Sequence, residues 1–321
     1  MLETPVLIIN FNRPDFTQRV MGVVMDQSPK ELYLFQDGPR VGRNDEPRLE
    51  EVRNIIKDAT AGTNSHVHTY FSDTNLGCGP GPAAALSWFF SNVEEGIIIE
   101  DDAVPHPDFF PYATQLLERY RNDDSVKAIG SMNVDKQQWG DGSYYFSMMN
   151  RNLCAWASWR RAWQFFDIRL PKTSRRDLSI ALRNYGCGLL EREYWCDRLD
   201  EVHKDGIGNS SWDMQFFMSI WLQHGKGIIP NSNLSSNIGT IVEATHPLGS
   251  GNIIDNIPTK PILPLIHPSS EEIVGEADRQ FHFLYFQPGR SKWKKKDIYK
   301  YLINNRLKEI LGHKGPWRKR R

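Results

Sequence analysis

The segment GIIIEDDAVPHPDFF, from Gly96 to Phe110, is the most informative part of the sequence. Residues 96–99 are typical of a buried strand, and three carboxylates follow at once, those of Glu100, Asp101 and Asp102. Because like charges repel, three carboxylates at the end of a buried strand require a physical explanation. One cause is a divalent cation that joins them to a bound substrate. The other is a solvated acidic turn before the next helix, where carboxylates are favoured.

Around this segment, apolar runs alternate with stretches of helical periodicity. The patterns predict strands at 5–10, 31–38, 66–72 and 95–102 and helices at 13–25, 46–59, 81–93 and 106–121. Such alternation is typical of a doubly wound parallel sheet, so the expected fold class is α/β. In such sheets ligands bind beyond the carboxyl ends of the strands. Each predicted strand ends in polar or small residues, which favours a site at that edge.

The pattern is looser after Gly130, and we expect a soft boundary near residue 131. A strand is predicted at 143–149, an aromatic helix at 154–166, and further helices within 174–205 and 211–225. Residues 250–290 are rich in Pro, Gly and Asn and are expected to be extended or loosely ordered. Residues 292–312 form a candidate basic amphipathic helix.

The 321 residues carry 39 Lys and Arg and 39 Asp and Glu, so nothing global indicates nucleic acid. Residues 291–321, however, hold 12 basic against 2 acidic residues. This tail indicates either contact with an anionic membrane face or a solvated helix packed on its own domain. The start has no signal-peptide pattern, and no apolar run reaches the roughly 18 residues of a spanning helix. The four cysteines lack CxxC spacing, as expected for free thiols in a reducing compartment, so we expect a cytoplasmic protein.

Several motifs in order resemble one family. IIIEDDAVPHPDFF resembles the metal-site segment of GT-A glycosyltransferases, especially the N-acetylglucosaminyltransferase I group. Bacterial glycosyltransferase-like proteins are closer still, through NLGC at 75–78, the aromatic segment WASWRRAW at 156–163 and WD at 212–213. The resemblance covers roughly residues 5–247. It implies a nucleotide-sugar-binding half at 1–130, an acceptor half of the same domain at 131–250, and a separate C-terminal segment at 251–321.

The resemblance implies a nucleotide-sugar donor, with a UDP-sugar favoured, held with Mn²⁺ or Mg²⁺. Asp102 would ligate the metal, and His246 would be a second metal ligand or a diphosphate contact. The residues implied in donor binding are Asn10, Asn12, Arg13, Asp37, Asn75, Gly77, Glu100, Asp101, Trp156 and Trp159. Asp37 is also explained as an Asp-Gly turn residue, and the tryptophans as core. Where bacterial relatives often carry a basic residue after NLGC, this chain has Gly79-Pro80-Gly81-Pro82, which shifts diphosphate neutralisation onto the metal.

Sugar transfer needs a base for the acceptor hydroxyl. In the resembled family this base begins a helix of the C-terminal half, which corresponds to Asp213, with Ser210 or Ser211 as helix cap. An aspartate at a helix start is also favoured electrostatically without any catalytic role. The expected activity is therefore inverting, metal-dependent transfer to a glycan or lipid-linked glycan, with peripheral contact at the inner membrane face. The alternatives are a sugar-nucleotide pyrophosphorylase, which would be expected to carry a glycine-rich first loop, and a non-catalytic nucleotide-sugar binder.

Overall fold

The structure is a computed structural model that describes residues 1–149, 154–205, 212–239, 253–288, 296, 297, 299–301 and 303. The described chain forms one eight-stranded sheet in the order β3-β2-β1-β4-β8-β6-β9-β7 and a two-stranded sheet of β5 and β10. The strands of the first half are β1 (Val6–Asn10), β2 (Glu31–Gln36), β3 (His66–Phe71), β4 (Glu95–Glu100) and β5 (Ala103–Pro105). Those of the second half are β6 (Val126–Gly130), β7 (Tyr144–Ser147), β8 (Ala155–Trp159), β9 (Lys226–Pro230) and β10 (Ser235–Asn237).

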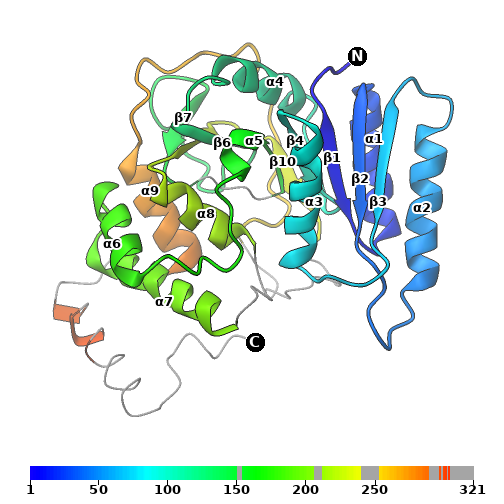
Figure 1. The fold of residues 1–321 in the computed structure, drawn as a ribbon. Helices are drawn as coiled ribbons and strands as arrows, with labels where there is room; N and C mark the ends of the chain where they lie inside the picture. Colours follow the sequence, from blue (N-terminus) through cyan, green and yellow to red (C-terminus); the bar gives the residue numbers. More distant parts are fainter. Residues whose placement is uncertain are drawn as a thin grey trace.

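Helices cover both faces of the large sheet (Figure 1). One face packs against α1 (Pro14–Asp26), α2 (Glu46–Thr60) and α4 (Phe109–Arg119), and the other packs against α3 (Pro80–Asn92), α5 (Arg160–Trp163) and α8 (Asp213–Leu222). The remaining helices are α6 (Arg175–Asn184), α7 (Leu189–Asp205), α9 (Gly275–Phe281) and the π-helix η1 (His282–Phe286). The fold class is therefore α/β, with a mixed, mainly parallel sheet flanked by helices, as predicted.

The first half follows the sequence pattern closely. Pro14 begins α1, where its fixed φ and missing N–H suit a first helical position, and Thr17, Val20, Met21 and Val24 form its buried stripe. β1 pairs in parallel with β2 and with β4. Gly96 in β4 lets α3 approach closely, because a Cβ there would lie 2.3 Å from the Phe89 ring. The predicted elements before Gly130 are thus confirmed to within a few residues.

The aromatic helix predicted at 154–166 is wrong in its first half. Residues 155–159 form β8, which pairs antiparallel with both β4 and β6, and only residues 160–163 are helical, as α5. Tryptophans three residues apart point to opposite faces of a strand, and accordingly Trp156 and Trp159 enter different core clusters. Both faces of β8 are buried, so its apolar residues lack the alternation that reveals a strand at a sheet surface.

The segment expected to be extended, 250–290, contains α9 and η1. The side chain of Asp278 in α9 accepts a hydrogen bond from Ser147 Oγ and another from the Met148 amide at 2.9 Å, which holds α9 against the end of β7. Of the predicted basic helix, six residues are described, all helical: Lys296, Asp297, Tyr299, Lys300, Tyr301 and Ile303. The rest lies outside the described residues.

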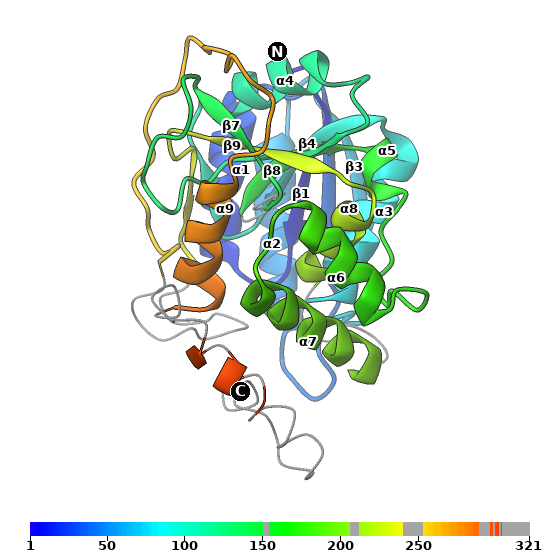
Figure 2. The same cartoon turned by 90° about the vertical axis from the view of Figure 1, so that its left-hand side faces the viewer.

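The N-terminus lies beside α4, with Thr4 and Thr114 hydroxyls 2.7 Å apart, and α7 lies at the opposite end of the molecule (Figure 2). Within the described ranges, no helix combines the length and apolar character needed to cross a bilayer.

Candidate functional site

The strand order of the large sheet reverses between β1 and β4. From β1 the sheet runs to β2 and β3 on one side and to β4 and the second half on the other. Ligands of open α/β sheets bind beyond the strand ends at such a switch point. Residues 10–13 follow β1 there, and residues 100–102 end β4. The structure therefore brings together two segments that the sequence analysis had singled out separately.

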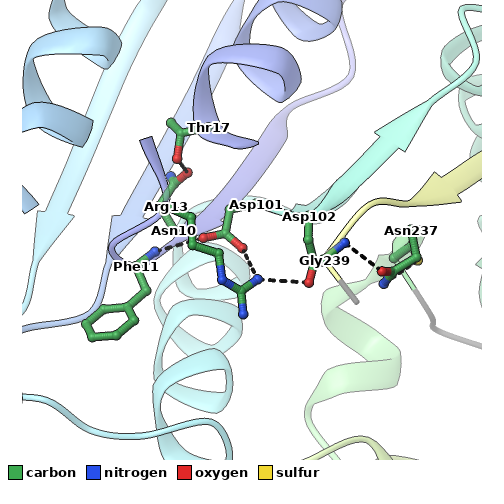
Figure 3. Close-up of polar contacts among 9 residues, drawn as sticks. Asn10, Phe11, Arg13, Thr17, Asp101, Asp102, Asn237 and Gly239 are labelled. Atoms are coloured by element: carbon green, nitrogen blue, oxygen red, sulfur yellow. Dashed lines mark hydrogen bonds and ion pairs between the residues drawn. The ribbon is translucent and has the colours of Figure 1, made fainter. Parts of the chain in front are cut away.

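Arg13 joins the two segments (Figure 3). Its Nη1 donates to Asp101 Oδ1 at 3.1 Å and to Asp102 Oδ2 at 2.9 Å, and the Arg13 side chain is only 14% exposed. Burial lowers the pKa of Arg13, but the carboxylates of Asp101 and Asp102 raise it more, so the pKa lies above its ordinary value. A positive charge does lie among the acidic residues, and the protein itself supplies it.

The acidic residues at the end of β4 are strongly perturbed. Burial raises the pKa of Glu100 well above its ordinary value, and the negative charges of Asp102, Asp101 and Asp213 raise it further. Burial also raises the pKa of Asp101 to about 6, against the opposing effect of Arg13. Asp101 Oδ2 accepts a hydrogen bond from the Phe11 amide at 3.2 Å, so its carboxylate also ties the loop after β1 to β4.

Asp102 lies against the segment that follows β10. β5 and β10 pair antiparallel, and the Ile238 amide donates to the Asp102 carbonyl at 2.9 Å. Gly239 packs on the Asp102 side chain so closely that a Cβ there would lie 2.2 Å from Asp102 Oδ2. The Gly239 amide donates to Asn237 Oδ1 at 2.9 Å (Figure 3). Residues 237–239 thus lie directly against Asp102.

Asp102 is the residue that best fits the implied metal. Its Oδ1 is buried without a hydrogen-bond partner among the described residues, which leaves an anionic oxygen available to a hard cation. Across the part of the chain that the structure describes, no three His, Cys, Asp or Glu side chains are arranged to hold a metal ion. A cation here would therefore depend on oxygens of the diphosphate, as Mg²⁺ and Mn²⁺ commonly do. His246, the second predicted ligand, lies outside the described residues.

Asp213, the predicted base, occupies the first position of α8. Its charge contributes to the raised pKa of Glu100, which places the two carboxyl groups within electrostatic reach of each other. The helix cap is Trp212, without a side-chain cap hydrogen bond, rather than the predicted Ser210 or Ser211, which lie outside the described residues. Trp212 is buried and stacks on Trp156, with ring centroids 5.7 Å apart. The packing of Trp212 in the core fixes the start of α8, and with it Asp213.

Asp37, at the end of β2, holds the loop before α3. Its two carboxylate oxygens accept hydrogen bonds from the amides of Gly38, Leu76 and Gly77 and from Asn75 Nδ2, at 2.8–3.0 Å. Gly77 has φ +85°, a left-handed conformation that glycine adopts readily. Asp37, Asn75 and Gly77 thus form one unit that shapes the approach to α3, and contact between this unit and a nucleotide stays a prediction.

Asn10 and Asn12 are buried and bonded within the protein. Asn10 Oδ1 accepts from Thr17 Oγ1 at 3.3 Å. Asn12 Nδ2 donates to Asp45 Oδ1 at 2.8 Å, and Asp45 in turn receives two side-chain hydrogen bonds from Arg40. These hydrogen bonds hold the loop after β1 in its conformation. Direct contact of either asparagine with a donor stays a prediction.

The predicted sugar-facing tryptophans lie in the core. Trp156 has no exposed surface and Trp159 is 2% exposed, so neither ring is open to contact with a sugar. Trp163 lies in the core as well.

Sequence reasoning missed three residues near this site. Cys154 is buried, and its carbonyl accepts the Glu100 amide at 3.3 Å. Asp255 forms a bridge with Asn237, and Asp255 Oδ1 is a second buried oxygen without a partner among the described residues. Tyr285 lies in η1, and its pKa is raised by burial and then by the charge of Asp213. Only the π-helix geometry and long-range pairing bring these residues here, so no local motif could have found them.

No protein-family model matches the sequence, and no curated protein sequence does. Among solved structures, HddC from Yersinia pseudotuberculosis is 14% identical over 50% of this chain and 78% of its own, with a TM-score of 0.32. A UDP-glucose pyrophosphorylase in complex with UDP-glucose is 9% identical over 71% and 90%, with a TM-score of 0.35. Mouse xyloside xylosyltransferase 1 is 12% identical over 69% and 82%, with a TM-score of 0.30. Likenesses this low carry no argument about function.

Proposed function

We propose that the protein is a glycosyltransferase that moves a sugar from a nucleoside-diphosphate donor, a UDP-sugar foremost, to a hydroxyl of a glycan or glycoconjugate. The observation that carries the proposal is the acidic cluster at the switch point. Glu100 and Asp102 lie at the end of β4, where Asp102 Oδ1 has no partner among the described residues, and the charge of Asp213 at the start of α8 raises the pKa of Glu100. Acidic groups on two elements, one at a strand end and one at a helix start, suit a reaction with a donor side and an acceptor side.

The roles follow from position and charge. Asp102, with its unpartnered Oδ1, would hold Mn²⁺ or Mg²⁺, and such a cation supplies Lewis-acid stabilisation of a leaving diphosphate. Arg13 adds a fixed positive charge on the same side. Asp213 would accept the proton of the acceptor hydroxyl as its oxygen bonds to the sugar's anomeric carbon. The bond from that carbon to the diphosphate oxygen breaks, and the electron pair leaves with the nucleoside diphosphate.

The proposal is tested by separating donor binding from transfer. We expect calorimetry to show UDP binding that requires Mn²⁺, and we expect Asp102→Asn to abolish it. Asp213→Asn should keep UDP binding within about threefold but reduce transfer at least about 100-fold, the usual scale for loss of a general base. Asp58→Asn, a change at an exposed aspartate of α2, is the matched control and should alter neither.

Two outcomes would contradict this function. UDP binding that ignores both Mn²⁺ and Asp102 would remove the donor site. Release of pyrophosphate from UTP and a sugar phosphate would instead indicate a pyrophosphorylase. The loop after β1 does not favour that activity, because residues 11–13 contain no glycine.

A further inference from the structure

A cation that reaches Asp102 without a diphosphate meets the positive charge of Arg13. Arg13 donates hydrogen bonds to the carboxylates of both Asp101 and Asp102, so a positive charge already lies against them. A free divalent cation at Asp102 would therefore meet a guanidinium already bonded to the same carboxylate.

Arg13 is also held in place. It begins the turn into α1 immediately before Pro14, its side chain is largely buried, and its guanidinium lies between the two aspartates (Figure 3). Asp101 is fixed from a second side by the Phe11 amide, and Asp102 by Gly239. Because both carboxylates are constrained, a cation cannot separate them from Arg13 at little cost.

A diphosphate changes this balance. It brings its own negative charges, which can neutralise a metal at Asp102 Oδ1 and the Arg13 guanidinium together. We propose that Arg13 makes the cation site conditional: the charge of Arg13 keeps Mn²⁺ or Mg²⁺ from occupying Asp102 until a nucleoside diphosphate is bound with it. This inference rests on the proposed function and names Arg13 as a positioning residue for the metal–diphosphate pair.

The test measures metal binding without turnover. Free Mn²⁺ is followed by electron paramagnetic resonance as it is titrated into the full chain, with and without saturating UDP. For the wild type we expect weak binding of Mn²⁺ alone and at least about tenfold tighter binding with UDP. By thermodynamic linkage, Mn²⁺ must tighten UDP binding by the same factor.

Variants at position 13 identify the cause. Arg13→Gln removes the repelling charge, so Mn²⁺ alone should bind about tenfold tighter or more, while the gain from UDP shrinks. Arg13→Lys keeps the charge and should stay within about threefold of the wild type, although its geometry differs. Arg19→Gln, at an exposed arginine of α1, is the matched control and should change neither value. If Arg13→Gln does not fold, Arg13→Met is used instead, because methionine also removes the charge and has an unbranched side chain that can pack in the same place.

The outcomes separate the two proposals. Unchanged or weaker binding of Mn²⁺ alone to Arg13→Gln, with Asp102→Asn still abolishing the UDP complex, overturns the role of Arg13 and leaves the function standing. Equal behaviour of Arg13→Lys and Arg13→Gln also overturns it, because charge would not be the cause. A UDP complex that survives Asp102→Asn overturns the function itself.

Discussion

At the scale of single residues, the site depends on very close packing around one carboxylate. Asp102 touches Gly239 on one side and Arg13 on another, while its Oδ1 stays without a partner among the described residues. The position of this oxygen is therefore set by neighbours that belong to distant parts of the chain. Small changes at those neighbours should alter ligand binding more than they alter stability.

Gly239→Ala tests this dependence. An added Cβ would lie 2.2 Å from Asp102 Oδ2 and 2.7 Å from Asp102 Cβ, so the aspartate must move, although the backbone at 239 does not require glycine. We expect at least about tenfold weaker Mn²⁺-dependent UDP binding by calorimetry, since misplacement of a constrained ligand is costly. Gly22→Ala in α1 is the control, because nothing lies within 4 Å of its added Cβ. The control should keep binding and gain up to about 1 kcal/mol of stability. Equal UDP affinity in Gly239→Ala would contradict the arrangement.

The assignment of Asp213 came only from the resemblance, and its role stays a prediction. The acidic triplet and its place beside residues 10–13 followed from the sequence, because strand ends of a parallel sheet gather at one edge. The ion pairs of Arg13 and the contact of Gly239 with Asp102 did not. They join residues 88 or more positions apart, and no periodicity encodes such pairs. The tryptophan spacing wrongly predicted a helix, because residues three positions apart can share one helical face or lie on the two buried faces of a strand.

At the scale of elements, the helices α9 and η1 lie in a segment that its Pro, Gly and Asn content predicted to be extended. Residues 250–274 are rich in Pro, but the chain then forms a helix that packs through aromatic side chains. His282 lies at the start of η1, 1% exposed, beside Trp195 and Phe286. Its Nε2 lies 2.9 Å from Gln287 Oε1, and its Nδ1 has no partner among the described residues.

His282 should make the fold sensitive to acid. Burial lowers the pKa of His282 to about 4, below the ordinary 6.5, so the unfolded chain binds a proton more readily between those values. Stability from this residue is complete above pH 6.5 and is lost as the pH falls towards 4. Between pH 7.5 and 5 we expect the free energy of unfolding to fall by about 2 kcal/mol through this group alone. Urea unfolding of His282→Phe should lack this part of the pH dependence. An unchanged pH dependence in the variant would contradict the assignment.

At the scale of the whole molecule, the two halves separated by the predicted boundary share one sheet. β8, from the second half, lies between β4 and β6, and β9 pairs with β6 on its other side. The sequence analysis assigned no strand to β6 or β9. β6 is buried throughout, yet Lys127 interrupts its apolar run, and the Lys127 amine lies 5.0 Å from the centre of the Phe165 ring. Strands of five residues with such an interruption give no reliable pattern.

A fragment of residues 1–130 should not fold by itself. It would leave β4 without its partner β8 and β6 without either neighbour, and unpaired apolar strands associate with one another. We expect no cooperative unfolding transition by circular dichroism and aggregation on concentration. A chain of residues 1–288, which keeps all strands of the sheet, is the control and should unfold cooperatively. Monomeric, cooperative unfolding of the short fragment would show that the boundary separates independent units.

The position of β8 also affects how the chain is made. The ribosome delivers β4 first, then β6, and β8 only about 30 residues after β6, on the order of seconds later. Until then, the edges of β4 and β6 that will pair with β8 have no partner, because β8 has not yet been translated. A pause in translation between residues 130 and 155 would prolong that state, and chaperone binding at this stage would protect the unfinished sheet.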